Sequence, residues 1–311
     1  PGDSDSLGTR PRQGRQLRKL SALFYSYTTS GFSAMRILLI ADIHANWPAL
    51  AAIDEPFDAC LFLGDVVDYA TDPLPCIDWV RKYATAVVRG NHDHSVAQRV
   101  LVKPGGTFRR MAAAMRPRHF EVLGDDHLTW LARMPVTRHL TLGDHRFLLV
   151  HATPRDPMDE YIGDSVEQWQ QRLEHVDVDY VCVGHTHIPM QLQLDKTQVI
   201  NPGSVGQPRD GDPRAAYAII DRGQVEFRRV PYDIDRTVRH MRECGIDESV
   251  VAKAEVILRS GGSPSATQDS DEPALCRAFC SAKVGYSIGA PRICDGDSFA
   301  CPPELVAIAM N

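Results

Sequence analysis

Histidine, aspartate and asparagine residues follow five apolar runs of the chain, each just past the point where the run ends. The last run leads into His185 and His187. These two side chains point to the same side of an extended chain, because they are two residues apart. A protein core does not favour two imidazoles there, whereas a metal ion does if other segments supply further ligands. The four earlier runs lead into Asp42, His44, Asp65, Asp68, Asn91, His92, Asp93 and His151.

The five apolar runs are expected to be buried strands of an α/β domain, by length and composition. They span residues 36–42, 59–65, 85–93, 146–154 and 179–187. Helical stretches near 49–54, 75–83 and 165–175 separate several of them, and short strands are expected at 191–194, 198–201, 215–221 and 224–230. Sites in open α/β sheets form outside the carboxyl ends of the strands. We therefore expect the polar side chains to converge at one edge.

Each polar motif also has a structural interpretation when it is taken alone. A single histidine such as His151 is commonly a hydrogen-bonded core residue, and the aspartates after glycine or asparagine commonly cap turns or helices. Asp68 could cap a turn. Asp93 could either hydrogen-bond a ligand histidine or cap the next helix. Five such motifs in the same position relative to their strands are not well explained in this way.

Taken in order, the motifs resemble the signature of the calcineurin-like metallophosphoesterases. They read Asp42-Ile-His44, Gly64-Asp65 with Asp68, Gly90-Asn91-His92-Asp93, His151 and Gly184-His185-Thr-His187, and the resemblance covers residues 35 to about 230. The later segment NPGSVGQPR, residues 201–209, resembles the compact bacterial phosphodiesterase and phosphatase branch. The resemblance implies a four-layer α/β/β/α sandwich, here with a helical insertion and flexible tails.

The resemblance also implies two divalent metal ions. By the family pattern, one ion would be held by Asp42, His44, Asp65 and His187, and the other by Asp65, Asn91, His151 and His185, with Asp65 as the bridge. Imidazole and carboxylate ligands without a thiolate suit manganese, which we take as first choice, or iron, zinc or nickel. Metals so placed lower the pKa of a bridging water, and the hydroxide attacks phosphorus.

Three further residues are given roles by the same resemblance. His92 would act on the leaving group of a phosphodiester or phosphomonoester, and Asp68 would orient it, since an Asp–His pair keeps the imidazole charged and aimed. Arg209 is a candidate for contact with a substrate phosphate, although its turn-rich surroundings equally favour a structural role.

An insertion between two of the motifs is expected to influence the substrate. Residues 94–138 contain eight Lys and Arg residues against three Asp and Glu residues, an excess of +5 in a chain of net charge −6. A basic rim on this helical insertion would attract anions, which favours small, nucleotide-like substrates. The alternatives are a dinucleoside-polyphosphate hydrolase, a Ser/Thr protein phosphatase or a non-catalytic binding scaffold. Protein phosphatases of this family carry arginine where this chain has Tyr69, and scaffolds usually lose ligands that this chain retains.

The remaining predictions concern the domain limits and the cellular setting. Residues 1–34 are polar and basic and are predicted to be a disordered extension, 35–259 to form the catalytic domain, and 260–311 to be a linker and disordered tail. We see no apolar run of membrane-spanning length and no secretory signal. The eight cysteines form no dense framework. A cytoplasmic protein is predicted, with no strong indication of nucleic-acid binding and none of its oligomeric state.

Overall fold

The computed structural model describes residues 35–103 and 105–262. The predictions for residues 1–34 and for nearly all of 260–311 lie outside these residues. Among the described residues, no helix combines the length and the apolar character needed to cross a membrane.

The described residues contain two mixed sheets of five strands each. The first sheet has the order β10-β9-β1-β2-β3, with β1 (Arg36–Ile40), β2 (Ala59–Phe62), β3 (Ala86–Val87), β9 (Ala215–Asp221) and β10 (Gln224–Val230). The second has the order β4-β5-β6-β8-β7, with β4 (Thr137–Leu142), β5 (His145–Val150), β6 (Tyr180–Cys182), β7 (Met190–Leu194) and β8 (Thr197–Asn201). Neighbours β1, β2 and β3 run parallel in the first sheet, as do β5, β6 and β8 in the second.

Alternate residues of the strands pack the two sheets against each other. In β1, Ile37 and Leu39 face the second sheet, where they join Phe147 and Leu149 of β5 in one buried cluster. The residues between them, such as Leu38, face the outer helices. Both faces of the central strands are therefore apolar, which explains why the sequence shows continuous apolar runs there rather than alternation.

Helices cover the outer face of each sheet. On the first sheet lie α1 (Trp47–Ala51), α2 (Pro73–Tyr83), α3 (Asn91–Ala97) and α5 (Asp125–Arg133), whose apolar residues share a core cluster with β1 and β2. On the second lies α6 (Val166–Arg172), whose Trp169 is buried against β5, β6 and β8. The predicted four-layer α/β/β/α sandwich is therefore confirmed.

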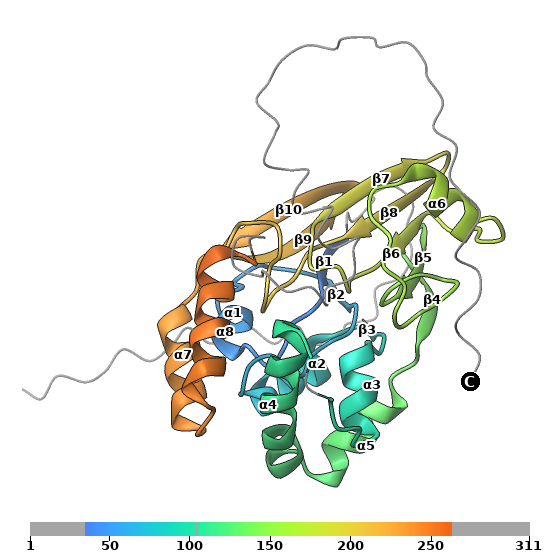
Figure 1. Cartoon of the computed structure of the whole chain (residues 1–311). Coiled ribbons are helices and arrows are strands. Elements are labelled where there is room, and N and C mark those ends of the chain that lie inside the picture. The colour runs from blue at the N-terminus through green and yellow to red at the C-terminus, as the bar shows by residue number, and fades with distance from the viewer. Residues whose placement is uncertain (1–34, 104, 263–311) are drawn as a thin grey trace, which may run out of the picture. The chain divides into compact units, whose positions relative to one another are not determined.

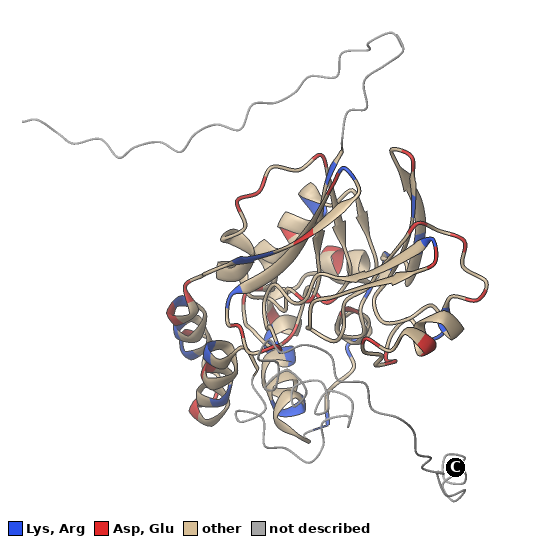
Figure 2. Cartoon of the chain, turned by 90° about the horizontal axis from the view of Figure 1, so that it is seen from above, with Lys and Arg blue, Asp and Glu red and all other residues tan. Residues whose placement is uncertain are grey.

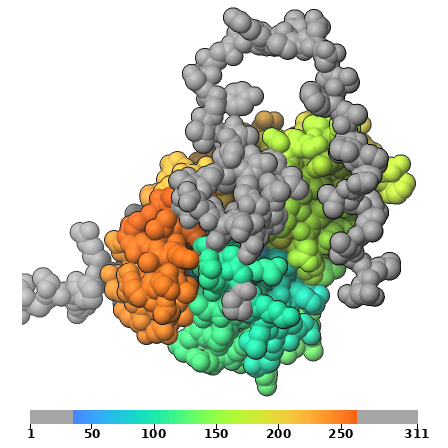
Figure 3. All heavy atoms as spheres, in the orientation of Figure 1, coloured from blue at the N-terminus to red at the C-terminus, as the bar shows by residue number. Residues whose placement is uncertain are grey.

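A smaller apolar cluster joins the insertion to the end of the described chain. It contains residues of α4 (Thr107–Val122), α7 (Ile234–Glu243) and α8 (Glu248–Ser260), and the space-filling view shows the α7–α8 pair beside α4 (Figure 3). Helices α7 and α8 were not predicted. Helix α7 buries only two apolar side chains, Val238 and Met241, and the α7–α8 pair carries residues of both charge signs (Figure 2). The two residues lie three positions apart, on one face of a mostly polar helix.

The third strand is shorter than predicted. Residues 85–93 were assigned to one strand, but β3 has only two residues and α3 begins at Asn91. The chain leaves the sheet early because Gly90 and Asn91 already form the amino end of that helix. Two of the predicted site residues, Asn91 and His92, therefore lie in the first turn of α3.

Candidate metal centre

The predicted ligands lie where the central strands of both sheets end. Asp42 and His44 follow β1, Asp65 follows β2, His151 follows β5, and His185 and His187 follow β6. All six side chains are buried. Each group of ligands takes residues from both sheets, so the site lies where the two sheets meet.

Five of these residues have left-handed backbone conformations. The φ angles are 53° at Asp42, 50° at His44, 62° at Asp65, 66° at His185 and 61° at His187. This conformation costs about 1–3 kcal/mol for a residue with a side chain, and it persists only where surrounding contacts impose it. Such strain concentrates at functional sites, and here it turns the side chains back across the strand ends.

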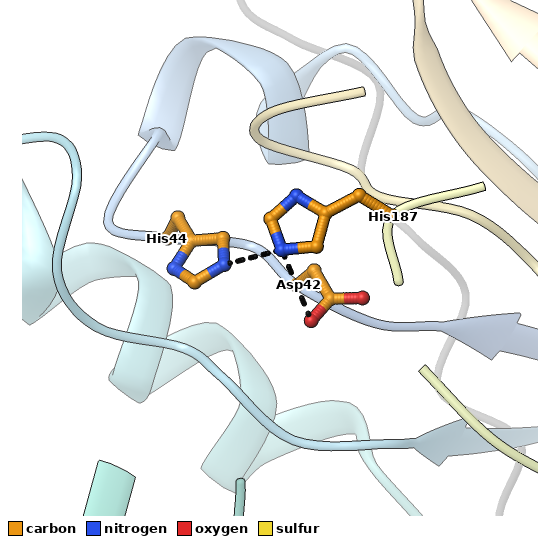
Figure 4. Close-up of side chains that lie close together, drawn as sticks. All are labelled: Asp42, His44 and His187. Atoms are coloured by element: carbon orange, nitrogen blue, oxygen red, sulfur yellow. Dashed lines mark hydrogen bonds and ion pairs between the residues drawn. The ribbon is translucent and has the colours of Figure 1, made fainter. Parts of the chain in front are cut away.

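Asp42, His44 and His187 form the first group, which we call cluster 1. The Nε2 atoms of His44 and His187 lie 3.1 Å apart, and His187 Nε2 lies 3.6 Å from Asp42 Oδ1 (Figure 4). The other ring nitrogens face backbone carbonyls, His44 Nδ1 at 2.8 Å from Val67 O and His187 Nδ1 at 2.6 Å from Gln207 O. Nδ1 must donate in these bonds, so in the neutral rings both Nε2 atoms carry lone pairs.

The two lone pairs of cluster 1 face each other without a proton between them. Burial lowers the pKa of His44 to about 3 and that of His187 well below its usual range, so protonation does not relieve the contact. A cation between the rings would accept both lone pairs and the Asp42 carboxylate. The donor set of cluster 1 therefore fits a divalent metal ion.

Asp65, His151 and His185 form cluster 2. His151 Nε2 lies 3.2 Å from Asp65 Oδ2, and His151 Nδ1 donates to Leu63 O at 2.7 Å. Within the described chain, the buried atoms His185 Nε2 and Asn91 Oδ1 have no hydrogen-bond partner, and His151 Nε2, although it lies close to Asp65 Oδ2, makes no hydrogen bond of regular geometry. Buried polar atoms are normally satisfied. Orphans that are all of metal-binding type indicate a second cation site.

The two clusters are contiguous, and their charges interact. The backbone N–H of His185 donates to the Asp42 carboxylate, at 3.1 Å from Oδ2. Burial, and then the neighbouring charge of Asp65, raise the pKa of Asp42 to about 7. Burial would lower the pKa of His151, but the Asp65 carboxylate outweighs it and raises that pKa to about 10. Without metal, the surroundings therefore favour a proton on Asp42 and on His151, where cations would otherwise compensate the carboxylates.

The loop after β2 is fixed by glycine and by Asp93. A Cβ on Gly90 would lie 2.0 Å from Asp65 Oδ1, so only glycine fits. The Asp93 carboxylate accepts from the backbone N–H groups of Asp65 and Val66, both at 2.8 Å, and from that of Gly90 at 3.1 Å. Of the two interpretations left open for Asp93, capping of α3 agrees with these contacts. In the structure it bonds the backbone of the Asp65 loop and not a histidine ring.

His92 and Asp68 form a pair beside the clusters. His92 Nδ1 lies 2.7 Å from Asp68 Oδ2, and the backbone N–H of His92 donates to Asp65 Oδ1 at 3.0 Å. Burial opposes charge on both groups, but the attraction of His92 and Arg116 lowers the pKa of Asp68 to about 2. The Asp65 and Asp68 charges raise the pKa of His92 despite its burial. The two carboxylates therefore favour the charged form of the imidazole next to cluster 2.

Aromatic side chains border the site, and Arg209 lies among them. The Tyr69 ring centre is 4.5 Å from that of His44 and 4.7 Å from that of His92. Arg209 is buried; its guanidinium carbon lies 3.9 Å from the centre of the Phe108 ring, and Nη2 donates to Gln207 Oε1. Phe108 belongs to α4, so the insertion does reach the site. Contact between Arg209 and substrate stays a prediction.

Four residues at the site had no assigned role in the sequence: Tyr69, Phe108, Arg116 and His119. Tyr69 was noted only because arginine is missing there. The other three lie in the insertion, and no spacing within it identifies which of its side chains turn inward. The nearest signal is the separation of Arg116 and His119 by three residues, which places them on one face of a helix.

The chain resembles known proteins in sequence and in structure. The model of the calcineurin-like phosphoesterase superfamily domain matches residues 35–224. An uncharacterized protein of Methanocaldococcus jannaschii is 30% identical over 228 residues, which are 64% of this chain and 89% of that protein. Phosphodiesterase YfcE of Escherichia coli K12 is 25% identical over 202 residues, 60% of this chain and 88% of that one. The crystal structure of a metallophosphoesterase from Sphaerobacter thermophilus is 35% identical, covers 74% of this chain and all of its own, and superposes with a TM-score of 0.61.

Proposed function

The chain belongs to the calcineurin-like phosphoesterase superfamily, and from this premise we propose that it hydrolyses phosphodiester or phosphomonoester bonds of small, nucleotide-like substrates. The observation that carries the proposal is the pair of buried Asp/His clusters with unsatisfied donor atoms, next to an Asp–His pair. A relative that is named a phosphodiesterase and another named a metallophosphoesterase support the reaction class.

In such a reaction, different residues of the chain would bind the cations and donate the proton. Cluster 1 would hold one cation, and cluster 2 with Asn91 would hold the other. Asp65 lies in cluster 2, and its sharing with cluster 1 is what the family resemblance implies. When bound, divalent cations polarise phosphoryl oxygens and make hydroxide available near neutral pH. The strained, buried loops hold the ligands in place before substrate arrives, so little reorganisation is needed. His92, with Nδ1 on Asp68, would give the proton of its other ring nitrogen to the leaving oxygen.

Nucleotide-like substrates are favoured by exposed cations of the insertion. Lys103, Arg109 and Arg110 are exposed near the start of α4, which is the end that carries Phe108. The basic excess at the surface is smaller than the sequence count, because Arg116 is buried against Asp68. We therefore place the attraction for anionic substrate on the first turn of α4.

The proposal is tested with the purified full chain, stripped of metal and reloaded separately with Mn²⁺, Fe²⁺, Zn²⁺ or Ni²⁺. Bis-p-nitrophenyl phosphate, p-nitrophenyl phosphate, nucleotides, cyclic nucleotides, dinucleoside polyphosphates and phosphopeptides serve as substrates. We expect metal-dependent hydrolysis, strongest with Mn²⁺, and none in a matched His185→Ala variant. Protein that binds two metals per chain and hydrolyses none of these esters would instead be a binding scaffold.

A further inference from the structure

A buried arginine of the insertion contacts the carboxylate of Asp68. The Arg116 side chain is 6% exposed and the Asp68 side chain is fully buried. Arg116 Nε lies 3.1 Å from Asp68 Oδ2 and 3.3 Å from Oδ1, and Nη2 also donates to Oδ2. The same Oδ2 accepts from His92 Nδ1. One carboxylate oxygen therefore joins the guanidinium to the imidazole.

The far side of the Arg116 guanidinium is fixed as well. Nη1 donates to the backbone carbonyl of Val100 at 2.9 Å, in the segment that leads into the insertion. Because the guanidinium is planar and rigid, bonds at Nη1 and at the Nε–Nη2 edge set its orientation. A lysine ammonium has no such fork, so it could keep the charge but not the orientation.

His119, one turn further along α4, holds the backbone beneath Asp68. Its Nε2 lies 3.0 Å from Ala70 O, and the backbone N–H of Asp68 donates to its Nδ1 at 3.3 Å. Burial lowers the pKa of His119, which agrees with a neutral ring that donates from one nitrogen and accepts at the other. Asp68 and Tyr69 have φ angles of 66° and 60°, so this loop is strained and depends on such contacts.

We infer that Arg116 is a positioning residue for departure of the leaving group, an inference that rests on the proposed function. Arg116 acts through Asp68: it holds the carboxylate in the one orientation in which His92 presents its other nitrogen to the substrate. In that step phosphorus would gain a bond to the attacking hydroxide oxygen and lose its bond to the leaving oxygen. The leaving oxygen would take the Nε2 proton of His92, and a neutral imidazole would remain bonded to Asp68. The insertion thus takes part in the chemistry as well as in substrate attraction.

The test compares Arg116→Lys and Arg116→Met with the wild type. The substrates are phosphodiesters that keep the same second ester group and differ only in the leaving group. Positioning contacts of this kind are worth about 10–100-fold. We expect kcat to fall by about that factor for phenyl or alkyl leaving groups, which need a proton. With p-nitrophenol, a good leaving group, kcat should change by less than about threefold, because its departure needs little acid catalysis. KM and the metal content should stay unchanged.

The matched control is Arg118→Ala, which removes an arginine of the same helix that pairs with Glu121 at the surface; wild-type rates are expected. In a His92→Ala background, Arg116→Lys should cause no further loss, because the two residues act as one unit. An equal loss for all leaving groups, loss of metal, or additive effects would overturn the inference.

A measurement without substrate separates this inference from the proposed function. The Nδ1–H proton of His92 should give a slowly exchanging downfield NMR signal in the wild type, weakened or lost in Arg116→Lys and retained in Arg118→Ala. A signal unchanged in Arg116→Lys would show that Arg116 does not hold the pair. If the wild type hydrolyses no ester, the proposed function fails, while the signal still decides whether Arg116 positions His92.

Discussion

Clusters 1 and 2 are supported by one part of the molecule, and the His92–Asp68 pair by another. The cluster ligands follow β1, β2, β5 and β6, and their hydrogen bonds run to other strand-end loops, such as that of His151 to Leu63. Asp68, in contrast, is held by Arg116 and His119 of α4, a helix that packs on α7 and α8 outside the sandwich. If the proposed function holds, metal binding would belong to the core of the fold, whereas proton donation would depend on an inserted helix.

The largest effect should follow from breaking the core side of this comparison. Asp65→Ala removes a carboxylate of cluster 2 that we also assign as the bridge, so metal content should fall below two per chain. Loss of an acid catalyst lowers the rate by about 10²–10⁴-fold. The kcat/KM of Asp65→Ala should fall by more than that. Elemental analysis and kcat/KM measure both. Asp177→Ala, which removes an exposed carboxylate paired with Arg146, is the control, and full metal content in Asp65→Ala would refute the ligand assignment.

The second-largest effect should follow from loss of His92 in the His92–Asp68 pair. His92→Ala should retain both metals, because His92 lies outside both clusters, yet lose about 10²–10⁴-fold in kcat for substrates with poor leaving groups. The loss should be small with p-nitrophenol. Metal loss in this variant would show that His92 is a ligand, and the division between the two supports would then be wrong.

Metal removal should lower the thermal stability of the protein, and the size of this effect should depend on the metal clusters and not on the His92–Asp68 pair. A cation at 100 times its dissociation constant stabilises the fold by about 2.7 kcal/mol, which corresponds to about 5–10 °C in Tm for a domain of this size. We expect chelation to lower the wild-type Tm by at least this amount and the Tm of His185→Ala by less, because that variant keeps cluster 1 but lacks a ligand of cluster 2. His92→Ala should respond to chelation as the wild type does. Calorimetry with and without EDTA measures the shifts, and equal shifts in all three proteins would contradict the assignment.

The smallest effect concerns the exposed cations of the insertion. Changing Arg109 and Arg110 together to Ala should raise KM for polyanionic substrates by about 2- to 30-fold, since exposed charges contribute about 0.2–1 kcal/mol each. The kcat should be unchanged, and the effect should shrink at high salt. Lys196→Ala with Arg222→Ala removes two exposed cations at the opposite ends of the strands and should leave KM as it is. An unchanged KM in the Arg109/Arg110 variant would remove the basic rim from the model of substrate binding.

The same contrast explains how much could be predicted from the sequence. The strand ends were predictable, because buried parallel strands leave continuous apolar runs and their polar ends must share one edge. His44, His151 and His185 were found in this way. The partners of Asp68 were not, because Arg116 and His119 lie in a helix whose position depends on packing against α7 and α8. The role of Asp93 was ambiguous in the sequence. An aspartate at this position can either cap the next helix or hydrogen-bond a metal-ligand histidine.

The origin of the ligands has a mechanical consequence. Cluster 1 combines Asp42 and His44 of the first sheet with His187 of the second, and cluster 2 combines Asp65 of the first with His151 and His185 of the second. A cation in either cluster would therefore cross-link the two sheets at one end, much as a disulfide ties two segments together. Apolar packing alone is non-directional, so it does not favour one end of the interface over the other. The cation would restrict sliding of one sheet over the other at the end that holds clusters 1 and 2, and sliding would remain easier at the opposite end.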